Sequence, residues 1–234
     1  MITEAIILAG GLGTRLQSVV HDVPKCLALV NYVPFLAYVL DYADGQGIEH
    51  IILSIGYKGA LIKQYVNAQD YDFEVTYITE AEPLGTGGAI VHSMQAATTD
   101  QVLILNGDTL FEYNLTKLFQ VQEYGFGHAT LCLKPMSNFD RYGAVISNNM
   151  GKIKAFNEKQ YVPQGLINTG VYAFDRQRLL QEKLPKKFSI EKDYFEKNIH
   201  THNLLASIQD AYFIDIGIPE DYAKAQTELK DKLC

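Results

Sequence analysis

The feature that most constrains this chain is a short apolar run near the N-terminus that ends in a cluster of glycines. Residues Ala5–Ala9 are apolar without interruption. The turn after this run contains Gly10, Gly11, Gly13, Thr14 and Arg15. An apolar run of this length is typical of a strand buried on both faces. Glycines let the backbone turn tightly and bring several N–H donors against an anion. The pattern therefore predicts a buried strand that leads into an anion-binding turn.

Strand and helix patterns alternate through the first hundred residues, which indicates a mostly parallel sheet. Strands are expected at residues 5–9, 51–55, 75–79 and 102–105, with helices at 34–43, 60–68 and 86–97. Further strands are expected at residues 129–133, 144–146, 153–156, 169–174 and 212–214, and a last helix at 219–233. We therefore expect an α/β fold with a Rossmann-like mixed, mostly parallel sheet flanked by helices.

No linker or repeat divides the chain, so residues 1–234 are expected to form a single domain. Its first half, about residues 1–110, would bind a nucleotide, and the rest, about 111–234, would bind the second substrate. Ligands of open α/β sheets lie outside the carboxyl ends of the strands. Three unusual clusters follow such ends, namely residues 10–15, 80–88 and 106–109. We expect them to form one site.

The glycine turn does not match the two commonest nucleotide motifs. Leu16 stands where a dinucleotide-binding fingerprint has its third glycine, and the Gly-Lys-Ser/Thr end of a Walker loop is missing. The motifs Ala9-Gly-Gly-Leu-Gly-Thr-Arg-Leu16, Pro24-Lys25, Glu82-Pro-Leu-Gly-Thr-Gly-Gly88, Leu105-Asn-Gly-Asp108, Glu158-Lys159 and Asn168-Thr-Gly170 occur in this order. In this combination the chain resembles the sugar-1-phosphate nucleotidyltransferase family, over nearly its whole length.

The resemblance implies the nucleotide-diphospho-sugar transferase fold and attack of a sugar 1-phosphate on the α-phosphorus of a nucleoside triphosphate. Alignment and charge neutralisation supply most of the catalysis in such a reaction. By resemblance, the catalytic residues are Arg15, Lys25 and Asp108, with Arg15 on the departing phosphates and Lys25 bridging the α-phosphate. The nucleotide-binding residues that it implies are Ala9, Gly10, Gly11, Gly13, Thr14, Glu80, Pro83, Gly85, Thr86 and Asn106.

Two phosphate groups that approach each other call for a divalent cation, and Mg²⁺ is the expected cofactor. Its expected ligands are Asp108 and Asp215, because a carboxylate between Ile214 and Ile216 is costly to bury unless it is paired or metal-bound. A helix cap or a turn is the alternative role of either aspartate.

The acceptor is expected in the second half of the chain. By resemblance, the sugar-phosphate-binding residues are Tyr142, Gly143, Glu158, Lys159 and Asn168, although an ordinary surface ion pair is the alternative for Glu158 and Lys159. Glu80 is able to accept N1–H and N2–H of guanine together, which favours GTP, yet uridylyl relatives have similar loops.

Finer motifs narrow the acceptor within the family. They are Asn138-Phe-Asp-Arg-Tyr-Gly143, Gln164-Gly-Leu-Ile-Asn168 and Phe213–Tyr222. They resemble those of the D-glycero-α-D-manno-heptose 1-phosphate guanylyltransferases of bacterial surface-polysaccharide synthesis, so GMP transfer to that sugar is expected. Mannose 1-phosphate as acceptor, and UTP or dTTP as donor, stay open.

Two other classes of protein compete with this interpretation. A regulatory protein that only binds a sugar nucleotide would not need the four charged residues Arg15, Lys25, Asp108 and Asp215, all of which are present. A glycosyltransferase usually holds its metal with Asp-x-Asp, and Asn106 occupies the first of those positions.

Composition excludes several partners. The net charge of −7 argues against nucleic acid and anionic membranes, since both require a basic surface. No apolar stretch of membrane-spanning length and no signal peptide is evident, so a cytoplasmic location is expected. A homo-oligomer stays open.

Overall fold

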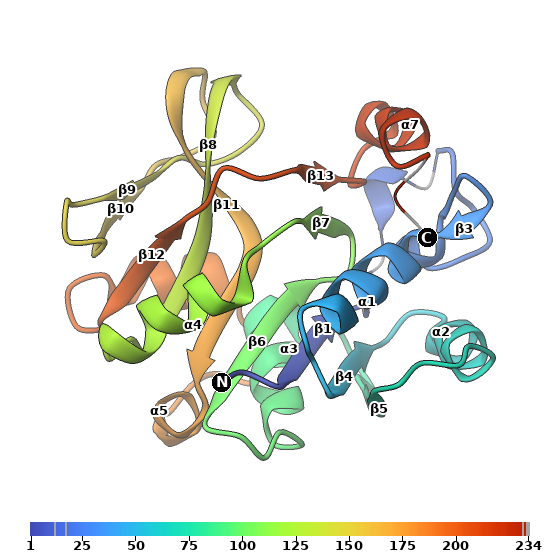
Figure 1. The fold of residues 1–234 in the computed structure, drawn as a ribbon, viewed down its shortest axis with the longest axis horizontal. Coiled ribbons are helices and arrows are strands. Elements are labelled where there is room, and N and C mark those ends of the chain that lie inside the picture. The colour runs from blue at the N-terminus through green and yellow to red at the C-terminus, as the bar shows by residue number, and fades with distance from the viewer. Residues whose placement is uncertain (12, 17, 231, 233–234) are drawn as a thin grey trace.

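A computed structural model describes residues 1–11, 13–16, 18–230 and 232 of the chain. Its centre is a seven-stranded sheet with the order β12-β8-β11-β6-β1-β4-β5 (Figure 1). The strands are β1 (Glu4–Leu8), β4 (His50–Ile55), β5 (Glu74–Thr79), β6 (Gln101–Asn106), β8 (Ala129–Phe139), β11 (Val162–Asp175) and β12 (Leu204–Ile208). Only β11 runs antiparallel to its neighbours in this sheet, so the prediction of a mixed, mostly parallel sheet is confirmed.

Helices cover both faces of this sheet. The described α-helices are α1 (Phe35–Gly45), α2 (Gly59–Asn67), α3 (Gly85–Met94), α4 (Leu115–Tyr124), α5 (Arg176–Gln181), α6 (Glu196–Asn198) and α7 (Pro219–Glu228). Shorter turns are the 3-10 helices η1 (Thr14–Leu16) and η2 (Lys25–Leu27) and the π-helix η3 (Ile190–Phe195). The last helix was expected to reach residue 233, and this prediction was wrong because α7 ends at Glu228; residues 231, 233 and 234 lie outside the described part.

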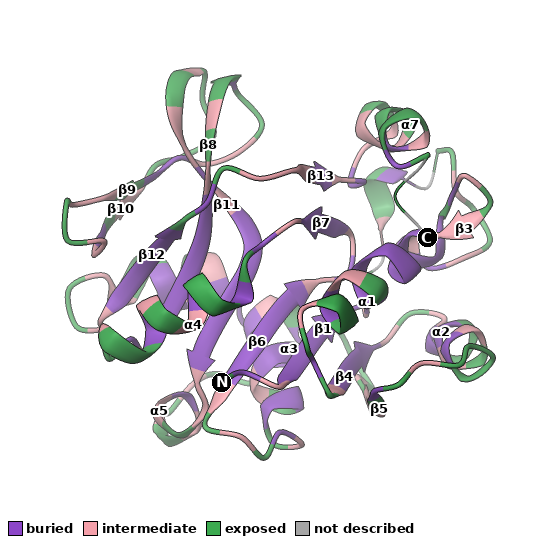
Figure 2. Cartoon of the chain, viewed as in Figure 1, coloured by how far each residue is buried: buried purple, intermediate pink, exposed green. Residues whose placement is uncertain are grey.

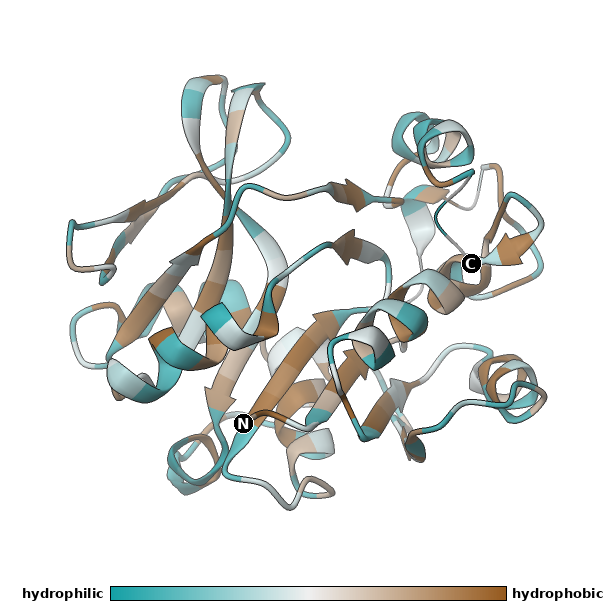
Figure 3. Cartoon of the chain, in the orientation of Figure 1, coloured by the Kyte–Doolittle hydropathy of each residue, from teal (hydrophilic) through white to brown (hydrophobic). Residues whose placement is uncertain are grey.

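Alternation along the strands divides the core into two layers. Ala5 and Ile7 of β1 pack in a cluster with α1, α2, α4 and α7, whereas Ile6 packs on the other face with α3, α5 and η3. Such a strand has apolar side chains on both faces because both faces are covered. Figures 2 and 3 show the result, since the central strands are both the most buried and among the most hydrophobic parts of the chain.

Three two-stranded sheets complete the fold. They are β2 (Leu29–Val30) with β3 (Val33–Pro34), β7 (Thr109–Phe111) with β13 (Phe213–Asp215), and β9 (Val145–Ser147) with β10 (Ile153–Phe156). The pairing of β7 with β13 brings the last part of the chain back beside the end of β6, where one of the predicted clusters lies. None of the helices formed by the described residues has the length and apolar character that crossing a bilayer needs.

Candidate active site

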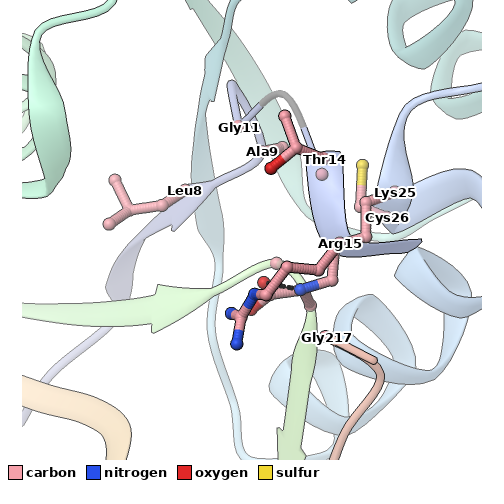
Figure 4. A pocket seen from close by; sticks show the side chains of 11 residues that line it. Leu8, Ala9, Gly11, Thr14, Arg15, Lys25, Cys26 and Gly217 are labelled. Atoms are coloured by element: carbon pink, nitrogen blue, oxygen red, sulfur yellow. Dashed lines mark hydrogen bonds and ion pairs between the residues drawn. The ribbon is translucent and has the colours of Figure 1, made fainter. Parts of the chain in front are cut away.

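A cavity of about 200 Å³ lies beside the turn after β1, and we call it the glycine-loop cavity. Seven residues that the sequence predicted line it, namely Ala9, Gly11, Gly13, Thr14, Arg15, Lys25 and Asp108. Figure 4 shows the Arg15 and Lys25 side chains extending into this space from η1 and η2. The loop after β1, the loop after β6 and the segment after β13 therefore converge on one cavity.

Two glycines of the loop are required by close approach to predicted side chains. Gly13 has φ +59°, and a Cβ there would lie 2.8 Å from Cβ of Lys25. A Cβ on Gly10 would lie 2.6 Å from Oε1 of Glu80. Any larger side chain at these positions would displace Lys25 or Glu80. Glycine is therefore required here by close packing as well as by the conformation of the turn.

Lys25 lies between two carboxylates. Its ammonium forms an ion pair with Asp108, marked by the dashed line in Figure 4, and its Nζ lies 3.8 Å from Oδ1 of Asp215. The aspartates are far apart in sequence but adjacent in space, because β7 pairs with β13 in a register that puts Asp215 opposite Thr109. The predicted metal ligands are thus brought together, although the described residues contain no group of three or more His, Cys, Asp or Glu that could hold a metal ion.

Burial raises the pKa of Asp215, and the nearby negative charge of Asp108 raises it further, while Lys25 partly offsets both effects. The N–H of Gly217 donates to Oδ1 of Asp215 at 2.6 Å. The pair of aspartates is therefore a place where an additional positive charge would be favourable.

Cys26 also lines the glycine-loop cavity, but it is not a nucleophile. Burial, followed by the negative charge of Asp108, raises the pKa of its thiol to about 12. A thiol with such a pKa stays protonated near neutral pH. The chemistry of the cavity thus belongs to its cations and carboxylates.

The loop after β5 carries Glu80, whose carboxylate is held by two donors. The Ser54 hydroxyl donates to Oε1 at 3.2 Å, and the N–H of Leu84 donates to Oε2 at 3.1 Å. A carboxylate has about four acceptor positions, so one position remains free on each oxygen. This arrangement leaves Glu80 able to accept two parallel N–H donors.

The remaining residues predicted to bind the nucleotide do not line the glycine-loop cavity. Pro83 and Gly85 are exposed, and Thr86, the second residue of α3, donates its hydroxyl to Oε2 of Glu191 at 3.2 Å. Asn106 ends β6 and packs over Gly170. Gly87 donates its N–H to Phe188 O at 3.0 Å, which ties the start of α3 to the segment before η3.

A second cavity of about 340 Å³ contains all five residues predicted for the acceptor, and we call it the π-helix cavity. These residues are Tyr142, Gly143, Glu158, Lys159 and Asn168. They come from the loop before β9, the loop after β10 and the middle of β11. Within the described part of the chain no ion pair joins Glu158 to Lys159, so the alternative of a surface salt bridge finds no support.

A third cavity of about 200 Å³ shares Tyr142 with the π-helix cavity and contains Asp215, which lies beside Lys25 of the glycine-loop cavity. Its wall contains an ion pair between Arg141 and Asp221, with Nη2 and Oδ2 2.8 Å apart. The Tyr142 ring packs edge-on against the Phe213 ring, with 5.6 Å between the ring centroids. The loop that carries Tyr142 is thus fastened to β13 and α7.

Sequence reasoning missed several residues of these cavities. Gly217 was not predicted, although it lies within the Phe213–Tyr222 motif and lines the glycine-loop cavity. A Cβ at this position would lie 2.7 Å from Oδ1 of Asp215. The π-helix cavity is also lined by Ser189, which caps η3, by Glu191 of η3 and by Glu196 of α6. The Ser189-Ile-Glu-Lys192 segment was not recognised as a motif, because charged residues without a periodic pattern resemble an ordinary surface loop.

Comparisons with known proteins agree with this geometry. A family model described as nucleotidyl transferase matches residues 4–232. A D-glycero-alpha-D-manno-heptose 1-phosphate guanylyltransferase of Aneurinibacillus thermoaerophilus is 47% identical, covering 97% of this chain and 98% of that protein. The protein of the same name from Campylobacter jejuni is 41% identical, covering 94% of this chain and 96% of that protein.

A crystal structure of HddC from Yersinia pseudotuberculosis matches with a TM-score of 0.88 at 34% identity, covering 98% of this chain and all of that one. HddC has also been solved in complex with GMP-PN, with the same degree of similarity.

Proposed function

Because the chain belongs to the nucleotidyl transferase family of enzymes, we propose that it transfers GMP from GTP to D-glycero-α-D-manno-heptose 1-phosphate. The products are GDP-heptose and pyrophosphate. The observation that carries the proposal is the placement of Lys25 between Asp108 and Asp215 at the glycine loop, in a chain similar along nearly its whole length to two guanylyltransferases for this acceptor.

In the proposed reaction an oxygen of the heptose 1-phosphate attacks the α-phosphorus of GTP. A new P–O bond forms there while the bond to the β-phosphate bridging oxygen breaks, and pyrophosphate leaves with that electron pair. Backbone N–H groups of the glycine loop and the Arg15 guanidinium hold the departing phosphates. Lys25 is placed to follow charge as it moves from the α-phosphate to the leaving group, since an ammonium has three donors on a flexible stem.

The donor set beside Lys25 fits Mg²⁺. That ion is commonly held by one or two carboxylates and completes its shell with substrate phosphate oxygens and water. Asp108 and Asp215 would hold it, and the Lys25 ammonium already lies between them as a positive charge. When bound, Mg²⁺ supplies charge neutralisation and polarises the phosphoryl group.

The choice of guanine is assigned to Glu80. Its two carboxylate oxygens each keep a free acceptor position, which matches the adjacent N1–H and N2–H donors of guanine. Uracil and thymine have one ring N–H between two carbonyl groups and would place a carbonyl oxygen against the carboxylate. Binding of those bases at Glu80 is therefore unfavourable.

The acceptor is assigned to the π-helix cavity. There Lys159 would form an ion pair with its phosphate, and Glu158 and Asn168 would form hydrogen bonds with its hydroxyl groups. This cavity adjoins the space beside Asp215 through Tyr142. Both substrates are thus able to approach the same pair of aspartates. A cytoplasmic location, where GTP is available, stays a prediction from the sequence.

A matrix of nucleotides against sugar phosphates tests the proposal. Purified protein with MgCl₂ receives GTP, ATP, CTP or UTP together with D-glycero-α-D-manno-heptose 1-phosphate or mannose 1-phosphate, and pyrophosphate release is followed with mass analysis of the product. We expect the highest kcat/KM for GTP with the heptose phosphate and no comparable rate in Lys25→Met.

Two results would overturn parts of this proposal. Higher kcat/KM with mannose 1-phosphate would replace the acceptor and leave the reaction class intact. Absence of pyrophosphate release with every pair, in a protein that melts cooperatively, would refute nucleotidyl transfer itself.

A further inference from the structure

Glu191 lines the π-helix cavity and has no role in the proposed reaction. It is the second residue of the π-helix η3, a rare helix type that is often found at functional sites. Its carboxylate receives hydrogen bonds from three hydroxyl groups that come from three separate parts of the chain. These bonds form two series, one on each carboxylate oxygen.

The bonds on the Oε1 side lead to Asn168. The N–H of Gly170 donates to Oδ1 of Asn168 at 3.1 Å, so the amide nitrogen of Asn168 faces the other way and donates to the Tyr172 hydroxyl at 2.9 Å. The Tyr172 hydroxyl then donates to Oε1 of Glu191 at 3.4 Å, the longest contact of the series. Because a backbone N–H only donates, the direction of every bond in this series is determined.

The bonds on the Oε2 side lead to the start of α3. The N–H of Ile190 donates to the Thr86 oxygen at 2.9 Å, and the Thr86 hydroxyl donates to Oε2 of Glu191 at 3.2 Å. The Ser189 hydroxyl donates to the same oxygen at 2.9 Å. Each hydroxyl has a single proton, and Glu191 accepts all three.

Tyr172 makes this arrangement costly to change. The ring is fully buried, and among the described residues Glu191 is the only acceptor of its hydroxyl proton. Burial, and then the negative charge of Glu191, raises the pKa of Tyr172 well above its ordinary value. The phenol therefore remains a donor, and loss of the carboxylate would leave a buried polar group without a partner.

We infer that Glu191 is a positioning residue that fixes the Asn168 amide in the acceptor's cavity and ties it to Thr86 at the start of α3. The inference rests on the proposed function, because the acceptor must bind at Asn168 for its position to matter. Fixed in this way, Asn168 keeps one N–H and one acceptor position for sugar hydroxyls. Thr86 directly follows the loop assigned to the base, so the two half-sites share one carboxylate.

The test compares Glu191→Gln with Glu123→Gln in steady-state assays with GTP and the heptose phosphate. An amide has one acceptor oxygen and opposes donors with its own NH₂, so one of the two series must break. We expect Glu191→Gln to raise the KM for the sugar phosphate roughly tenfold, with kcat and the KM for GTP within about threefold of wild type. Glu123 is the matched control, since it is an exposed carboxylate of α4 that lines none of the three cavities, and its variant should stay within about twofold.

Two further variants test the connection itself. Thr86→Val should raise the KM for the sugar phosphate more than the KM for GTP, which would distinguish its bond to Glu191 from the nucleotide contact that the resemblance implies for Thr86. The double variant Glu191→Gln/Tyr172→Phe should be no worse than the worse single variant, because both changes break the same series. If Glu191→Gln does not melt cooperatively, Thr86→Val and Tyr172→Phe provide the same measurement.

The outcomes separate this inference from the proposed function. A wild type that transfers GMP, with equal sugar-phosphate KM in Glu191→Gln and Glu123→Gln, overturns the inference alone. If the wild type transfers no GMP, the proposed function fails, and NMR of the Asn168 side-chain amide decides the inference. Amide shifts that are the same in wild type and Glu191→Gln overturn it, whereas shifts that move only in Glu191→Gln support it.

Discussion

The buried carboxylate of Glu4 makes the stability of this fold depend on pH in a calculable way. Glu4 begins β1 and is 4% exposed. It accepts bonds from the N–H and hydroxyl of Thr98 at 2.8 and 3.0 Å, and of Thr99 at 2.7 Å each. Nδ1 of His50 lies 2.9 Å from its Oε1. Glu4 thereby joins the start of β1 to the loop between α3 and β6.

The size and sign of the effect follow from the pKa of Glu4. Burial alone would raise this pKa, but the bonds from Thr99, His50 and Thr98 outweigh burial and lower it from 4.5 to about 2. A lowered pKa in the folded state means that the ionised carboxylate stabilises the fold above pH 4.5, and that this stability is lost as the pH falls toward 2. The full contribution is about 3 kcal/mol, of which about 1.4 kcal/mol is lost between about pH 7 and pH 3.5.

Urea denaturation of wild type and Glu4→Gln at about pH 7, 5 and 3.5 measures this contribution. Glutamine cannot accept from all five donors, so we expect the variant to have a free energy of unfolding about 3 kcal/mol lower at pH 7. The difference should shrink by about 1.4 kcal/mol at pH 3.5. Glu74→Gln is the control, because Glu74 begins β5 at the same end of the sheet but is exposed. A deficit that stays constant with pH, or equals that of the control, would refute the assignment.

Three predictions concern the reaction. Lys25→Met should lower kcat about a hundredfold while the melting temperature of the protein in MgCl₂ changes by only a few degrees; equal fractional losses of activity and stability would indicate a structural lysine. Glu80→Gln should raise the KM for GTP roughly tenfold and reduce the preference for GTP over ITP, which lacks the N2 amine; an unchanged preference would remove Glu80 from base selection. Chelation of Mg²⁺ by EDTA should stop GMP transfer and added MgCl₂ should restore it, and Asp215→Asn should raise the MgCl₂ concentration for half-maximal rate about tenfold; full activity in EDTA would contradict the metal assignment.

The parts of the fold that the sequence predicted are those with an unambiguous local pattern. The strand expected at residues 5–9 is β1 at Glu4–Leu8. The prediction succeeded because a short unbroken apolar run is typical of a strand that is buried on both faces. β12 at Leu204–Ile208 was missed, since a short run after a polar stretch has no periodic signal of its own. The helix α4 was also missed, although Asn114 caps it by accepting from Lys117 N at 2.8 Å.

In the candidate site, too, the residues within local motifs were predicted, and the residues placed by tertiary packing were not. Lys25 and Asp108 were predicted because each stands in a short motif, and both line the glycine-loop cavity. The position of Asp108 follows from the end of β6, whereas Lys25 reaches the cavity from η2. Glu191 was not predicted, because its contacts with Thr86 and Tyr172 depend on how α3, η3 and β11 pack. No local pattern distinguishes a carboxylate with three hydroxyl donors from one that faces water.

The relative positions of the three cavities concern how the acceptor phosphate would approach the α-phosphate of GTP. In-line displacement needs the acceptor phosphate on the side of the α-phosphorus opposite to the departing pyrophosphate. Lys25 lines the glycine-loop cavity, and its Nζ lies 3.8 Å from Oδ1 of Asp215. Asp215 lines the third cavity together with Tyr142, which also lines the π-helix cavity. In the proposed reaction the α-phosphate would lie beside Lys25 and Asp215, where the ammonium and the proposed Mg²⁺ would supply positive charge. The loop that carries Tyr142 is held to α7 by the ion pair of Arg141 with Asp221. If the two substrates bind as proposed, the distance between their reacting phosphates should therefore depend on this ion pair, which lies outside both substrate cavities.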